Sequence, residues 1–93
     1  MELSDELQRG DMAAAVLDNP IYAESWEMVR NGIIAAWENA PIRDKEGQNE
    51  LKLMLKVLGD LRKTVEQTMQ TGKLARIQIE QEGIVSRTIK RFG

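Results

Sequence analysis

The stretch that decides the fold is Ala40-Pro41-Ile42-Arg43-Asp44. It separates two segments in which apolar residues recur at intervals of three and four, the spacing of one face of an α-helix. Pro41 ends the first segment, because proline cannot donate a backbone hydrogen bond inside a helix. Asp44 is a suitable N-cap for the second segment. A connector this short requires the second helix to fold back antiparallel to the first.

The helix before this corner is expected over residues 20–40. Asn19 and Pro20 begin it, since asparagine caps free backbone N–H groups and proline suits the first helical position. Its apolar positions repeat every seven residues, which is typical of a helix that packs along its length against another. These positions are Tyr22, Trp26, Val29, Ile33, Ala36 and Ala40.

The helix after the corner is expected over residues 45–71. The predicted inner stripe is Leu51, Met54, Leu58, Leu61, Val65 and Thr68. Leu53, Leu55 and Val57 lie off that line, and Arg62 is expected on the face exposed to water. The apolar surface of this helix is therefore broader than one partner helix can cover, which predicts a second contact.

The corner also predicts which residues of the two helices face each other. A turn centred near Arg43 brings Trp26 opposite Gly59 and Asp60. A glycine in the middle of a helix costs about 1 kcal/mol relative to alanine, so Gly59 and Gly32 each need an explanation. One interpretation is that Gly59 makes room for the indole of Trp26, and the other is that both glycines are simply tolerated.

The two ends of the chain differ in charge. The net charge of the whole chain is −2. Residues 1–18 are expected to form an acidic arm, or one frayed helical turn, over residues 1–10 and then a short helix that begins near Asp11. Residues 73–93 are expected to form a basic tail, helical or extended, after a left-handed helix C-cap at Gly72. Such asymmetry suggests electrostatic pairing between copies or with partners, although two solvated termini are an equal alternative.

The predicted fold class is therefore all-α. It is an antiparallel hairpin of two long helices with a short N-terminal helix and a basic C-terminal tail, and residues 1–93 form a single domain. At this length one core buries only about two-thirds of the unfolded surface, and chains of this kind often gain further burial by oligomerising.

Catalytic and metal-binding residues are scarce in this sequence. It contains no histidine and no cysteine, which removes imidazole bases, thiolates and the usual zinc ligands. We therefore expect no enzyme activity, no metal and no cofactor. No apolar stretch approaches the roughly 18 residues that span a bilayer, so no membrane partner is expected. The acidic N-terminus is unlike a signal peptide and favours synthesis in the cytoplasm.

The candidate interface residues lie outside the predicted inner stripes. Large aromatic residues often anchor interfaces. For Trp26 the core interpretation is favoured, whereas Trp37 fits a core or an interface equally well. The surplus apolar flank and the basic tail supply the others, and the tail has the charge and the aromatic ring that nucleic-acid binding would use. The candidate set is Trp37, Leu53, Val57, Arg87, Lys90, Arg91 and Phe92.

Four short stretches carry a resemblance to a known family. They are Asp18-Asn19-Pro20-Ile21-Tyr22, residues 36–47, Leu58-Gly59-Asp60-Leu61 and Thr71-Gly72-Lys73-Leu74-Ala75. Over about residues 12–76 this pattern of turns and stripes resembles small helical proteins of tailed bacteriophages, which are encoded among virion-structure genes. The resemblance implies a phage assembly or virion-associated protein, and it carries over no role for any single residue.

Three functions follow as hypotheses. The leading one is a non-enzymatic phage structural or assembly protein that associates, helix to helix, with itself or another virion protein. The second is a scaffolding-type chaperone that holds coat protein through the basic tail. The third is a small nucleic-acid-binding or host-regulatory protein. The expected location is the host cytoplasm during synthesis, with the virion as a second location for the first hypothesis.

Overall fold

The computed structural model describes the backbone of residues 2–92 and the side chains of residues 2–83. The regular elements of this part of the chain are three α-helices: α1 (Leu3–Asp18), α2 (Pro20–Asn39) and α3 (Lys45–Phe92). No strand occurs among the residues described, which confirms the all-α prediction. The helices form two compact units, one over Val16–Thr64 and the other over Met1–Ala15 with Val65–Gly93.

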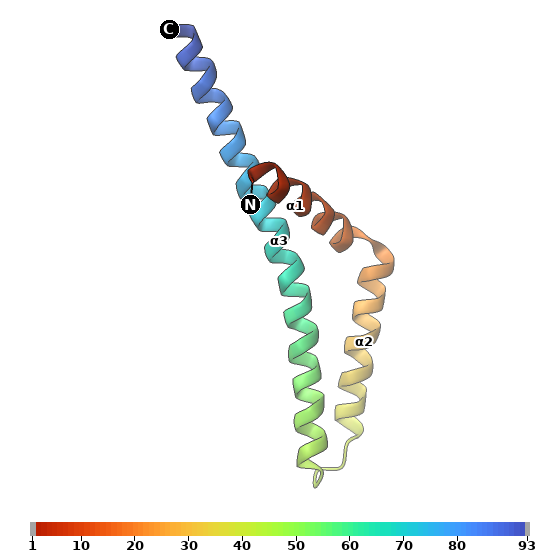
Figure 1. The fold of residues 1–93 in the computed structure, drawn as a ribbon. Coiled ribbons are helices and arrows are strands. Elements are labelled where there is room, and N and C mark those ends of the chain that lie inside the picture. The colour runs from red at the N-terminus through yellow and green to blue at the C-terminus, as the bar shows by residue number, and fades with distance from the viewer. Residues whose placement is uncertain (1, 93) are drawn as a thin grey trace. The chain divides into compact units, whose positions relative to one another are not determined.

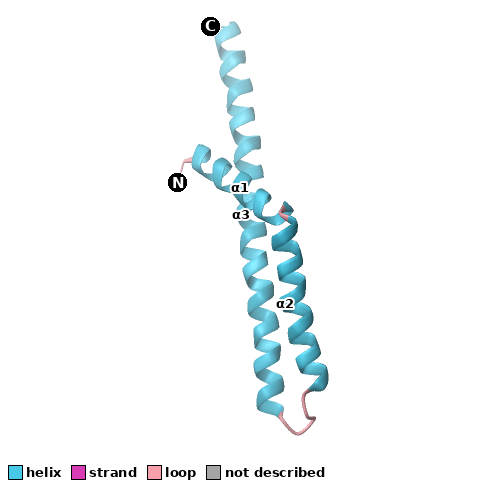
Figure 2. Cartoon of the chain, turned by 90° about the vertical axis from the view of Figure 1, so that its right-hand side faces the viewer, coloured by secondary structure: helices cyan, strands magenta, loops and turns pink. Residues whose placement is uncertain are grey.

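Helix α2 begins and ends, and helix α3 begins, at or next to the residues that the sequence predicted. The side chain of Asn19 accepts hydrogen bonds from the backbone N–H groups of Ile21 and Tyr22, and Pro20 opens α2. Ala40 is the C-cap of α2. The carboxylate of Asp44 accepts a hydrogen bond of 2.9 Å from the N–H of Gly47 in the first turn of α3. Within Val16–Thr64, α2 and the first part of α3 therefore lie side by side and antiparallel, as Figures 1 and 2 show.

The face of α3 that meets α2 differs from the predicted stripe. Its half-buried side chains are Leu51, Leu55, Leu58 and Arg62. Met54 and Leu61, which were predicted to face inward, are exposed by 50% and 58%. Apolar residues spaced three and four apart occur on two adjacent faces of this helix. The sequence alone favours the face that contains Leu61. Arg62 faces inward instead, because its guanidinium lies over the ring of Trp26.

The proposed role of Gly59 is wrong. A Cβ atom built on Gly59 would meet no heavy atom within 4 Å, and the same is true of Gly32. The indole of Trp26 therefore needs no space from a missing side chain. The predicted register itself is confirmed, since Trp26 contacts the carbonyl of Leu58 and the guanidinium of Arg62, on either side of Gly59.

The N-terminal segment is more helical than predicted. α1 begins at Leu3, so residues 3–10 belong to this helix and do not form an arm. Asp5 and Glu6 lie in its first turn, where negative charge interacts favourably with the helix dipole. Leu3, Glu6 and Leu7 are half-buried along one face, and Gly10 and Ala13 are fully buried. Burial of this face is the reason that a polar-looking segment is helical.

Gly72 is not a helix C-cap, which corrects the predicted end of the helix at residue 71. α3 continues through Gly72, and no glycine among the described residues has a positive φ. Gly72 instead lies against Gly10, where α1 crosses α3 (Figure 1). A Cβ built on Gly10 would stand 2.5 Å from the Cα of Gly72, and one built on Gly72 would stand 2.6 Å from the Cα of Gly10. The absence of both side chains lets the two backbones touch.

Small residues also flank this contact. Ala13 and Ala75 follow the two glycines by three residues each, and they are only 7% and 2% exposed. Beside them the guanidinium of Arg76 lies 3.2 Å from the carboxylate of Asp11. Both side chains are more than half exposed, so this ion pair adds at most about 1 kcal/mol. Close backbone packing, and not this ion pair, holds α1 on α3.

Two glycines of α3, Gly72 and Gly59, make a direct test of this crossing. Replacing Gly72 by alanine should lower the free energy of unfolding by about 1–3 kcal/mol, since the methyl group forces the helices apart. Gly59→Ala is the matched control in the same helix, and it should raise the free energy of unfolding by up to about 1 kcal/mol through helix propensity. Urea unfolding followed by circular dichroism measures both, and equal effects of the two substitutions would contradict the close contact.

Candidate interaction surface

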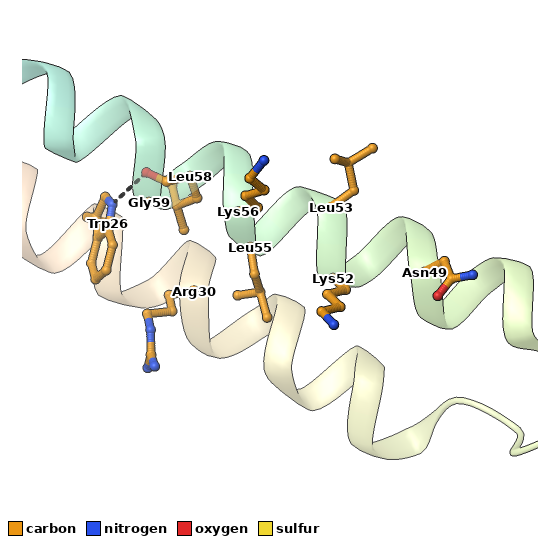
Figure 3. Close-up of a pocket in the computed structure, with 9 residues that line it drawn as sticks. All are labelled: Trp26, Arg30, Asn49, Lys52, Leu53, Leu55, Lys56, Leu58 and Gly59. Carbon is orange, nitrogen blue, oxygen red and sulfur yellow. Dashed lines mark hydrogen bonds between the residues drawn. The ribbon is translucent and has the colours of Figure 1, made fainter.

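The indole of Trp26 makes a polar contact and a cation–π contact with α3. Its Nε1–H donates to the carbonyl oxygen of Leu58 over 3.4 Å. The guanidinium carbon of Arg62 lies 4.6 Å from the ring centroid, within the range of a cation–π interaction. Figure 3 shows the indole beside α2, with its nitrogen directed at the carbonyl of Leu58 on α3. Trp26 is therefore a packed residue of the hairpin, as its position in the sequence favoured.

A groove of about 630 Å³ opens beside this tryptophan. Its apolar lining comes from Trp26, Leu53, Leu55 and Leu58, and Gly59 adds backbone. Its charged lining residues are Arg30, Lys52 and Lys56, with Asn49 as the neutral polar group. No carboxylate lines the groove. Figure 3 shows Leu55 extending toward α2 and Leu53 pointing the other way. The groove thus pairs an apolar floor with positive charge.

The candidate residues of the hairpin are exposed. Leu53 and Val57 are each 59% exposed and lie one turn apart on α3. Met54 and Leu61 extend the same face, so four large apolar side chains form one strip on α3. We call this set, Leu53, Met54, Val57 and Leu61, the apolar strip. Trp37 is 50% exposed near the end of α2, outside the groove.

The four candidate residues of the tail lie outside the part of the chain whose side chains the structure describes. They are Arg87, Lys90, Arg91 and Phe92. Their backbone belongs to α3, which runs to Phe92. The basic tail therefore remains a sequence-based prediction.

No protein-family model, curated protein or solved structure matches this chain.

Neither a metal-binding cluster nor a membrane-spanning helix is found in the described part of the chain. Among these residues, no group of three or more acidic, histidine or cysteine side chains is arranged to hold a metal ion. Within the same part of the chain, no helix is both long and apolar enough to cross a bilayer.

Sequence reasoning missed the positive charge of the groove. Lys52 and Lys56 are one turn apart on α3. Viewed along the helix axis, they lie on one side of Leu53, and Val57 lies on the other side. Their spacing of four residues was a visible signal, but the alternation of lysine with leucine in this stretch reads equally well as an ordinary amphipathic pattern. Only the packing of α2 against α3 shows that these lysines border a groove. Arg30 of α2 lines the same groove and adds a third positive charge.

Among the side chains described, one buried polar group has no hydrogen-bond partner. The hydroxyl of Tyr22 is buried and makes no hydrogen bond, although the rest of the side chain is only half-buried. An unsatisfied hydroxyl carries the cost of leaving water without the gain of a bond.

The two tryptophans test the importance of the indole contact. Trp26→Ala should lower the free energy of unfolding by about 2–4 kcal/mol, because packing, the hydrogen bond and the cation–π contact are lost together. Trp37→Ala is the matched control, and its half-exposed side chain should cost about 1 kcal/mol or less. Urea denaturation followed by circular dichroism measures both, and a larger loss for Trp37 would reverse our assignment.

Removing the unsatisfied hydroxyl should not weaken the protein. We expect Tyr22→Phe to leave the free energy of unfolding unchanged or to raise it by up to about 1 kcal/mol, because the desolvation cost disappears while the ring stays in place. Thermal unfolding of the two proteins provides the measurement. A loss above about 1 kcal/mol would mean that the hydroxyl has a partner, such as an ordered water molecule.

Proposed function

We propose that this chain is a non-enzymatic phage structural or assembly protein that works by helix–helix association with copies of itself or with another virion protein. The observation that carries the proposal is the apolar strip on α3, where Leu53, Met54, Val57 and Leu61 are each at least 50% exposed. Contiguous apolar surface on a soluble protein is typical of an interaction site. The phage setting is supported by the sequence resemblance alone.

The low burial of apolar side chains within one chain supports association. Only Ala13, Ile33 and Ala75 are buried apolar residues among the side chains described, so the helices have few neighbours within one chain.

The proposed mechanism is mutual burial of helix faces. The gain from burying apolar surface is about 25 cal/mol for each Å² removed from water. The strip lies on a helix that is already held by α2, so little additional chain ordering is needed when a partner binds. Synthesis and assembly would take place in the host cytoplasm, and the product would remain in the particle if its partner is a virion protein.

Self-association is the first test. Light scattering after size exclusion should give a mass that rises above that of one chain as the protein concentration increases. Val57→Gln combined with Leu61→Gln should weaken this association by about 10-fold or more, since two anchors of the strip that lie outside the groove lose their apolar contacts. Leu74→Gln is the control, because Leu74 is an equally apolar and exposed residue of α3 outside the strip.

Two outcomes would contradict the proposed self-association through the strip. If the chain stays strictly monomeric at high concentration, it does not associate with copies of itself. If Leu74→Gln weakens association equally, the strip is not the interface. The phage assignment has its own measurement, which is mass spectrometry of purified particles.

A further inference from the structure

The outer side of α2 carries a second exposed apolar surface. Ile21 and Met28 are 67% and 73% exposed, which makes them among the most exposed large apolar side chains of the hairpin. They are seven residues apart and therefore lie on one line along the helix. Glu24 and Glu27, both exposed, lie on the same outer half of α2, with Glu24 about 50° and Glu27 about 110° around the helix axis from this line. We call these four residues the α2 ridge.

The ridge and the groove are complementary in chemistry. The groove has an apolar floor and three cationic side chains without a carboxylate. The ridge has two large apolar side chains and two carboxylates without a cation. An occupant of the groove must bring apolar atoms for its leucines and negative charge for Lys52 and Lys56. The ridge has both, and Met28 is an adaptable side chain for filling an open groove.

We propose that the groove of one copy binds the α2 ridge of a second copy. Ile21 and Met28 would cover Leu53 and Leu58, while Glu24 and Glu27 would approach Lys52 and Lys56. This inference rests on the proposed function, in that it names the partner as the chain itself and specifies the surfaces. Groove and ridge both lie within Val16–Thr64, so neither depends on the N-terminal half of α1 or on the tail.

The distribution of charge favours a second copy over an unrelated partner. α2 contains three glutamates and one arginine, whereas the facing part of α3, residues 45–64, contains five basic and three acidic residues. The two helices of the hairpin therefore carry opposite net charges. Attraction between α2 of one copy and α3 of another follows from this distribution without any further component.

The contact has a definite symmetry. Groove and ridge are different surfaces, so each copy offers one of each and the interface is heterologous. Such contacts join copies head to tail, and they close into a ring or extend as a chain according to the rotation between neighbours. Because charge contributes, the association should weaken as salt rises toward 1 M, where the screening length falls to about 3 Å.

A charge-swap experiment on the full chain tests this arrangement. The first variant combines Lys52→Glu and Lys56→Glu, which gives a negative groove with a negative ridge. The second combines Glu24→Lys and Glu27→Lys, which gives a positive ridge with a positive groove. Each variant alone should self-associate about 10-fold or more weakly than the native chain at low salt, because like charges meet at the contact.

Mixing the two variants is the decisive step. The positive ridge of the second variant matches the negative groove of the first, and the remaining native ridge matches the remaining native groove. An equimolar mixture should therefore regain association to within about 3-fold of the native chain, as measured by sedimentation velocity. Glu80→Lys with Glu82→Lys is the control for the second variant, since it makes the same change in charge at exposed acids outside residues 16–64. Circular dichroism of each variant checks that it is folded.

Each result decides a different claim. Weakening of both variants, recovery in the mixture and native behaviour of the control would establish the groove–ridge contact. If the native chain associates but the variants behave like it, or if mixing restores nothing, the contact is wrong while helix association through the apolar strip still stands. If the native chain does not associate at any concentration, self-association and this inference fail together. If the native groove binds an added helical protein and does not bind a second copy, the occupant of the groove is a foreign partner and this inference is wrong.

Discussion

The indole of Trp26 and the corner at residues 40–44 together set the register of the α2–α3 hairpin. The corner limits how far the two helices can slide, because only five residues join them. The indole then selects the turn of α3 that it meets, through the carbonyl of Leu58 and the guanidinium of Arg62. This choice turns α3 so that Leu55 faces α2 and Leu61 faces water. The groove and the apolar strip both follow from that rotation.

The contact between α1 and α3 works by a different principle. In the hairpin, large side chains fill the space between the helices. At Gly10 and Gly72 the helices have no side chains at the crossing, and their backbones touch. A glycine in a helix is unfavourable by itself, since it gains conformational freedom when unfolded. Here that cost is offset by close packing, which also buries Ala13 and Ala75.

Both arrangements leave much apolar surface in water. A helix with a single neighbour buries only one face, and large aliphatic side chains on the other faces of α2 and α3 stay exposed. Association with other helices is the simplest way to bury such surface, and the separation of acidic from basic groups within the hairpin gives that association a direction.

The sequence by itself determined the helical class, the position of the corner, the caps at Asn19 and Asp44, and the register around Trp26. These features depend on local backbone chemistry and on the length of a short connector, both of which can be read from neighbouring residues. The sequence also showed that α3 has a surplus of apolar residues, with Leu53 and Val57 among them. The use of the basic tail, from Arg87 to Phe92, remains a prediction from charge alone.

Only the tertiary structure decided which face of α3 is inside, where α3 ends, and what Gly72 does. Residues 51, 54, 55 and 58 are all apolar, so the pattern permits two faces, and the choice is made by a contact with Trp26 from another helix. Likewise, Gly72 followed by lysine is a reasonable helix end when considered locally. It lies within a continuous helix because Gly10, far away in the sequence, packs against it. Contacts between distant residues carry no local signal, and for this reason the groove, with Arg30 beside Lys52 and Lys56, could be found only after folding.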